Sequence, residues 1–228
     1  MLQMGRMLST SFEKLPRRER GQMFRPSLEH FRMVRTRTLG LVRDLTQAEM
    51  DYAPAPEKWS VGEVLDHLLL AERFFRQEIR QLIERQKTGQ TPVLRRGFAE
   101  LDISIAFIPK ALLPFLEIPF SLLNPFVPRA VRDFFVRSRL IPAQHPRVAA
   151  PRKGRPADQL RAELSASLGE TEALFEAYPH FNYHQMQYIH PLLGTNDVLQ
   201  LLNIVRLHEE RHQEQIADVI RALPRRFS

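Results

Sequence analysis

Four long segments of the sequence repeat apolar residues at intervals of three and four, which places these residues on one face of an α-helix. The segments cover about residues 26–45, 60–86, 156–178 and 195–223. No pair of alternating strands joined by an Asn-Gly turn accompanies them. The pattern therefore predicts an all-α protein built as a four-helix bundle, in which each helix buries one apolar face.

Residues that typically start or stop helices stand at the ends of these segments. Ser27 and Thr195 are predicted N-caps, and Ser60 with Glu63 matches a capping box, in which each residue satisfies a free backbone N–H of the other. Prolines end the third and fourth segments because proline lacks the N–H that a helix needs. The first segment is expected to bury Leu28, Phe31, Val34, Leu41 and Leu45.

The connection between the second and third segments, about residues 92–150, is far longer than most helix–helix loops. Its part 98–142 is rich in Phe, Leu and Ile, and its prolines exclude one long helix, so we expect a mostly helical apolar insert of short helices. We interpret this insert as covering one end of the bundle and forming a homodimer face; a lid or a membrane-surface patch is the alternative. Residues 1–25 are interpreted as a basic arm and 26–228 as the bundle domain.

The 228-residue chain carries 33 Lys and Arg residues against 26 Asp and Glu residues, a net charge of +7. The excess lies in residues 1–37 and 129–161, whereas residues 162–220 are acidic. Clustered positive charge attracts nucleic acid or anionic membranes. No zinc finger, RNP-type motif or basic dimerisation helix accompanies it, so we interpret the charge as a solubilising or anion-attracting surface and expect no nucleic-acid partner.

The chain contains no cysteine, which excludes disulfides, thiolate-ligated zinc, iron–sulfur clusters and a cysteine nucleophile. No uncharged apolar run reaches the ~18 residues that a membrane-spanning helix needs. The polar, arginine-rich residues 1–25 lack the apolar region of a signal peptide. We therefore expect a soluble protein of the cytoplasm.

His208 and His212 stand four residues apart in the fourth segment, so both lie on one helix face. Two imidazoles on a core-facing stripe are costly without partners, which favours a shared metal ion over two core histidines. His67, at the edge of the apolar face of the second segment, is the predicted third ligand, because antiparallel packing brings the two levels together. Three neutral imidazoles with an open position are typical of Zn²⁺, Ni²⁺ or Fe²⁺ sites. The stripe that the histidines continue consists of Val198, Leu201, Val205, Ile216 and Val219.

Glu209 lies within one helical step of this stripe and is interpreted as a carboxylate behind the ligands, as a general base, or as a solvated helix charge. Residues 208–212 also fit the His-Glu-x-x-His motif of zincin metalloproteases. A protease is not favoured, since the extended form of that motif needs a glycine where Gln215 stands. Three further histidines are interpreted as packed or surface loop residues: His180, His184 and His190.

Two stretches resemble a known family. Residues 57–68, EKWSVGEVLDHL, are similar to the second-helix motif of DinB-like proteins. Residues 190–195, HPLLGT, leading to residues 208–216, HEERHQEQI, are similar to the fourth helix of that family. The likeness covers about residues 26–90 and 156–222, whereas the apolar insert and the basic arm depart from the family pattern.

The resemblance implies an up-down-down-up four-helix bundle, often dimeric, with one divalent metal ion held by three histidines. By motif these are His67, His208 and His212. Characterised relatives include thiol S-transferases that use bacillithiol or mycothiol, and a thiol-dependent maleylpyruvate isomerase.

From this resemblance we expect a metal-dependent transferase that activates a low-molecular-weight thiol for transfer to an electrophilic small molecule. Because the chain has no cysteine, the thiol must be a cosubstrate. Two alternatives stay open: a non-enzymatic metal-binding or stress-response module, and a metal-assisted hydrolase in which Glu209 activates water.

Overall fold

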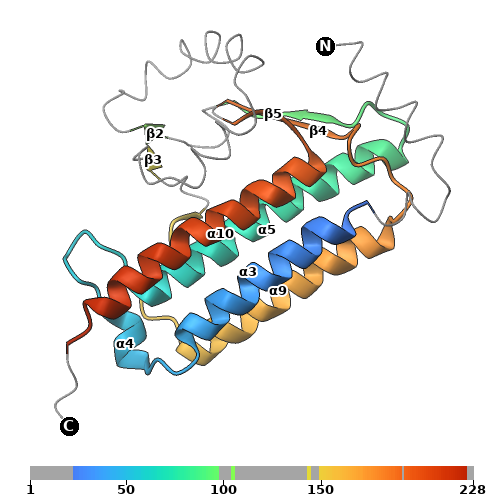
Figure 1. Cartoon of the computed structure of the whole chain (residues 1–228). Coiled ribbons are helices and arrows are strands. Elements are labelled where there is room, and N and C mark those ends of the chain that lie inside the picture. Colours follow the sequence, from blue (N-terminus) through green and yellow to red (C-terminus); the bar gives the residue numbers. More distant parts are fainter. Residues whose placement is uncertain (1–22, 98–103, 106–142, 145–148, 192, 225–228) are drawn as a thin grey trace.

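The computed structural model describes residues 23–97, 104–105, 143–144, 149–191 and 193–224. In this part of the chain four long helices lie side by side, with α3 and α10 running in one direction and α5 and α9 in the other (Figure 1). Helix α10 contacts α3 and α5, and α9 contacts the same two helices. The expected mostly helical fold is confirmed. The long helices are α3 (Arg25–Val42), α5 (Val61–Lys87), α9 (Ala157–Ala177) and α10 (Val198–Arg221).

The start of α3 differs from the prediction. Its N-cap is Phe24 rather than Ser27, and no side chain caps the helix. Pro26 occupies the first turn, where a missing N–H costs no intrahelical hydrogen bond, so the helix begins before the serine. The predicted capping box of Ser60 and Glu63 is confirmed at the start of α5.

The start of α10 also differs. Thr195 lies in a β-strand, and the N-cap is Asp197, which forms a capping box with Gln200. A short helix, α4 (Gln47–Asp51), stands in the link before α5 and was not predicted. Its backbone passes close to Gly62, where an added Cβ would lie 3.2 Å from the Met50 carbonyl oxygen.

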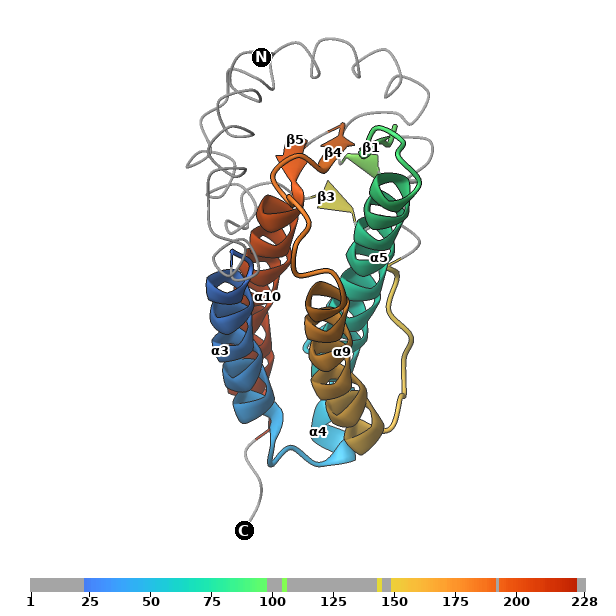
Figure 2. The ribbon, with the colours of Figure 1, turned by 90° about the vertical axis from the view of Figure 1, so that its right-hand side faces the viewer.

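A small sheet at one end of the helices corrects the all-α prediction (Figure 2). Strand β4 (Gln187–His190) pairs parallel with β1 (Val93–Arg95) and antiparallel with β5 (Gly194–Asp197). These strands of three or four residues are too short to show an alternating pattern, and β1 meets β4 from far away in the sequence. A second pair consists of β2 (Ser104–Ile105) and β3 (Ala143–Gln144), which run antiparallel.

The arm and most of the insert, residues 1–22, 98–103 and 106–142, lie outside the described residues. The mostly helical insert, its homodimer face and its alternative membrane-surface role therefore stay predictions. Among the described residues, no helix is both long and apolar enough to cross a membrane.

The apolar core of the described chain forms two clusters. In α5, the cluster toward the sheet uses Ile79, Leu82 and Ile83. The cluster toward α4 uses Val61, Val64, Leu65, Leu68 and Leu69. Between these positions α5 carries three buried charged residues, Glu72, Arg76 and Glu78. A polar layer thus separates the two apolar clusters along the helix.

Candidate metal centre

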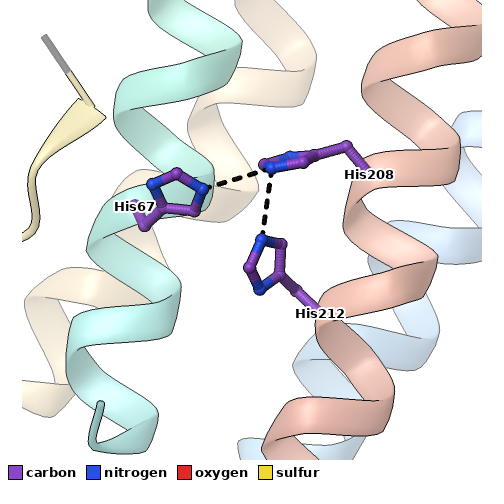
Figure 3. A group of neighbouring side chains, drawn as sticks. All are labelled: His67, His208 and His212. Carbon is purple, nitrogen blue, oxygen red and sulfur yellow. Dashed lines mark hydrogen bonds between the residues drawn. The ribbon is translucent and has the colours of Figure 1, made fainter. Parts of the chain in front are cut away.

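Three histidines from two helices meet inside the structure, and we call them the histidine centre: His67 of α5 with His208 and His212 of α10 (Figure 3). The Nε2 atom of His208 lies 3.2 Å from Nε2 of His67 and 3.2 Å from Nε2 of His212. Antiparallel α5 and α10 bring these levels together, as the sequence predicted.

The outer nitrogens of two rings are held by oxygen acceptors. His67 Nδ1 donates to the Ala149 carbonyl oxygen at 2.7 Å, and His212 Nδ1 donates to Gln215 Oε1 at 2.9 Å. A neutral imidazole has one N–H, so a proton on Nδ1 leaves a lone pair on Nε2. Hydrogen bonds of this kind fix the tautomer of metal-ligating histidines. Both Nε2 atoms are therefore prepared as ligands.

Burial keeps the His208 ring neutral. It lowers the pKa of His208 well below the ordinary value of 6.5, and His212, His67 and Arg211 act in the same direction. His67 and His212 are 4% and 7% exposed. A neutral His208 has a single N–H, so it can donate a hydrogen bond to only one of the two Nε2 lone pairs that face it. The His208 ring therefore brings no positive charge to the centre.

The spacing of the nitrogens also suits a metal ion. Zinc binds histidine nitrogen at about 2.0–2.1 Å, so two such nitrogens at a tetrahedral angle lie about 3.3 Å apart. The two contacts of 3.2 Å at His208 Nε2 agree with this value. Neutral nitrogen donors fit Zn²⁺, Ni²⁺ and Fe²⁺ alike. The residues present fit a divalent ion.

A family model of the DinB superfamily matches residues 30–216, most of the chain. The chain belongs to the DinB superfamily. The match includes all three members of the histidine centre and spans the long connection between α5 and α9. Comparison with the curated proteins and with the solved structures gives no match.

Trp59 packs against the histidine centre, a contact that the sequence did not predict. Its ring centroid lies 4.9 Å from that of His67 and 6.3 Å from that of His212, and the planes of Trp59 and His212 differ by 17°. The available signal was its position: it is the single tryptophan of the chain and directly precedes Ser60, the N-cap of α5.

Glu209 is not a solvated helix charge, since it is 1% exposed. Arg35 of α3 donates to both carboxylate oxygens, with Nε 2.9 Å from Oε1 and Nη2 2.8 Å from Oε2. Thr38 donates to Oε1 at 2.6 Å. The carboxylate thus binds α3, and these hydrogen bonds go to Arg35 and Thr38 rather than to the histidine centre. This geometry does not favour Glu209 as a general base.

Arg35 and Glu209 belong to a buried group that we call the Arg35 cluster, completed by Glu72 and Arg76 of α5. Arg35 Nη2 lies 2.9 Å from Glu72 Oε2, and Arg35 Nη1 donates to the Leu164 carbonyl of α9. Although burial acts to lower it, the neighbouring Glu209 and Glu72 raise the pKa of Arg35. The cluster joins all four long helices and was missed by the sequence analysis.

The buried face of α3 corrects a further prediction. Its buried residues are Leu28, Phe31, Arg35, Thr38 and Val42, whereas Val34, Leu41 and Leu45 are half-buried. The stripe keeps the expected helical spacing, but two polar residues take apolar positions because they bind Glu209.

The other histidines of the α9–α10 connection lie at the sheet end. His184 Nδ1 lies 2.9 Å from Asp197 Oδ2. His190 is 8% exposed, its Nδ1 accepts from the Leu193 N–H at 3.1 Å, and burial lowers its pKa to about 3. His180 is exposed. These positions agree with packed or surface residues.

Proposed function

We propose that His67, His208 and His212 hold one divalent metal ion per chain, and that the protein uses it to activate a low-molecular-weight thiol. The observation that carries this proposal is the convergence of three Nε2 atoms, two of them on rings whose Nδ1 is bound to an oxygen acceptor. The assignment agrees with the family to which the chain belongs.

A bound divalent ion lowers the pKa of a thiol and stabilises the thiolate, the nucleophile in thiol transfer. The chain has no cysteine, so the thiol is a cosubstrate. Its sulfur forms the new bond to an electrophilic carbon, the leaving group departs with the bonding electrons, and the thiol proton passes to solvent. In this reaction His67 and His212 present lone pairs, and Trp59 covers one side of the centre.

The proposal includes the up-down-down-up four-helix bundle of the family. It is supported by the opposite directions of the two helix pairs and by the two neighbours of each long helix (Figure 1). The helices that carry the ligands, α5 and α10, are neighbours in this arrangement.

The first experiment measures metal content. Protein purified without a His-tag is subjected to elemental analysis by mass spectrometry. The variants His208→Ala and His212→Ala are measured alongside it, and the control is His30→Ala, which changes an exposed histidine of α3. We expect one ion per chain in the wild type and in His30→Ala, and a severe loss in the other two. Unchanged stoichiometry in both His208→Ala and His212→Ala contradicts the site.

The second experiment separates a transferase from a metal-binding module. The metal-loaded protein is mixed with monochlorobimane and a set of low-molecular-weight thiols, and formation of the fluorescent conjugate is followed. We expect thiol-dependent consumption that His208→Ala abolishes. Metal binding without any such reaction favours the non-enzymatic alternative, and thiol-independent hydrolysis of esters or amides favours the hydrolase.

A further inference from the structure

Residues 149–155 form an irregular segment that runs beside α5 toward the start of α9, and we call it the strap (Figure 2). Its first residue, Ala149, is buried, and its carbonyl oxygen is the acceptor for His67 Nδ1. Near its end Gly154 has φ of +66°, a conformation that suits glycine. The strap therefore touches the histidine centre from outside.

Asp66 holds the strap at its other end. This aspartate, the residue before His67, is 0% exposed. Its Oδ2 accepts from the Arg152 backbone N–H at 2.8 Å, and its Oδ1 accepts from Arg152 Nη2 at 2.9 Å and from Arg155 Nη1 at 2.8 Å. One buried carboxylate thus binds two arginines of the strap.

We propose that Asp66 is a positioning residue for the metal centre. By binding Arg152 and Arg155 it keeps the Ala149 carbonyl on His67 Nδ1, and this hydrogen bond holds the tautomer whose Nε2 lone pair faces His208. Asp66 and His67 are adjacent on α5, so the two ends of the strap are fixed to one turn of the helix. The inference rests on the proposed metal site.

The chemistry of the contacts explains why a carboxylate is needed. Each donor comes from a guanidinium or a backbone N–H, and hydrogen bonds in which at least one partner is ionised are about twice as strong as neutral ones. An asparagine keeps one oxygen acceptor and turns an NH₂ donor toward the arginines. Asp66→Asn therefore releases the strap while it preserves the size of the side chain.

A matched control exists on α9. Glu163 also binds Arg155, with Oε1 2.5 Å from Nη2, and its Oε2 lies 2.9 Å from Arg73 Nη2. Glu163→Gln thus weakens an Arg155 ion pair without removing the acceptor of the Arg152 backbone. This control variant distinguishes the effect of losing an Arg155 ion pair from the effect of releasing the strap from Asp66.

The test measures the ring protonation of His67 in the metal-free full-length protein by nitrogen NMR of the imidazoles. We expect a single Nδ1–H tautomer in the wild type and in Glu163→Gln, and a mixture of tautomers in Asp66→Asn. Zinc affinity is then measured by competition with a chromophoric chelator. We expect a loss of about 10–100-fold in Asp66→Asn and a change within about twofold in Glu163→Gln.

A folded Asp66→Asn protein with the wild-type tautomer and zinc affinity overturns the proposal. If Asp66→Asn does not fold, Arg152→Ala takes its place, since it removes the side-chain donors but keeps the backbone N–H. A smaller loss in the same direction then supports the proposal, and unchanged affinity and tautomer overturn it. A wild type that binds no metal contradicts the proposed function, whereas the NMR result tests the strap by itself.

Discussion

Two buried polar groups lie next to each other along α5 and α10, and their chemistry differs. The Arg35 cluster sets two arginines against two glutamates, and its guanidinium and carboxylate groups bind one another, Thr38 and the Leu164 carbonyl. The histidine centre contains three imidazole rings whose inner nitrogens face each other. The charges of the first group are balanced within the protein, whereas the second group brings three ring nitrogens within 4.8 Å of one another. Burial of polar groups thus stabilises the fold in one place, and in the other it serves the metal binding that we propose.

The largest expected effect comes from breaking the Arg35 cluster. Arg35→Ala leaves Glu72 and Glu209 buried without their shared cation, and removal of one partner of a buried ion pair costs about 3–5 kcal/mol. We expect the free energy of unfolding, measured by urea denaturation, to fall by this amount. The control Arg32→Ala removes a half-exposed arginine of the same helix that binds Glu29 and Glu172. Exposed ion pairs contribute about 0–1 kcal/mol. An equal loss of unfolding free energy in the two variants would show that burial of the Arg35 cluster does not increase its contribution to stability.

Removal of bound metal tests the histidine centre. At a free metal concentration of 100 times Kd, a ligand that binds only the folded state stabilises it by about 2.7 kcal/mol. We expect a chelator to lower the free energy of unfolding of the wild type by this amount, and to leave His208→Ala unchanged. If the chelator lowers the free energy of unfolding of both proteins equally, the bound metal lies outside the histidine centre.

His190 shows what burial alone does to an imidazole away from the centre. In the folded protein its pKa is lowered to about 3, whereas in the unfolded chain it takes up a proton below about 6.5. The unfolded state then binds more protons, so stability falls as the pH falls, by about 2 kcal/mol between pH 7 and pH 5. We expect His190→Asn to reduce this dependence in denaturation curves at the two pH values, and His30→Asn, which changes an exposed histidine, to preserve it.

The sequence predicted the helices because their apolar spacing extends over many turns, and it predicted the histidine centre because His208 and His212 continue such a stripe. The same signal was available for the Arg35 cluster. Arg35 and Thr38 fall on the stripe of Leu28, Phe31 and Val42, where a charged residue needs a buried partner. The partner could not be named, since it lies in another helix and many acidic residues compete.

Other features left little or no signal in the sequence. The acceptor of His67 is the backbone carbonyl of Ala149, which any residue type supplies. Strand β1 joins the sheet by pairing with β4 from far away in the sequence, so its place there follows from tertiary packing rather than from local pattern. Trp59 stood out by its rarity, but only the structure shows that it packs on the histidine rings.

The smallest effect is expected at Gln215, the acceptor for His212 Nδ1. Gln215→Leu removes this acceptor from a half-buried position, so His212 is free to carry its proton on Nε2 instead. Loss of such an outer hydrogen bond typically lowers metal affinity at least tenfold, or about 1.4 kcal/mol. The stability of the metal-free protein should change by only about 0.5 kcal/mol, as for most surface substitutions.

Gln215→Glu sharpens this test, because a carboxylate accepts the same Nδ1–H and strengthens the histidine as a ligand. We expect it to keep or raise the zinc affinity that Gln215→Leu lowers, both measured by chelator competition. The single tryptophan, stacked on His212, gives an independent fluorescence signal for the same titration. Equal affinities of the two variants would mean that His212 keeps its tautomer without Gln215, and that the histidine centre is oriented by packing rather than by its outer hydrogen bonds.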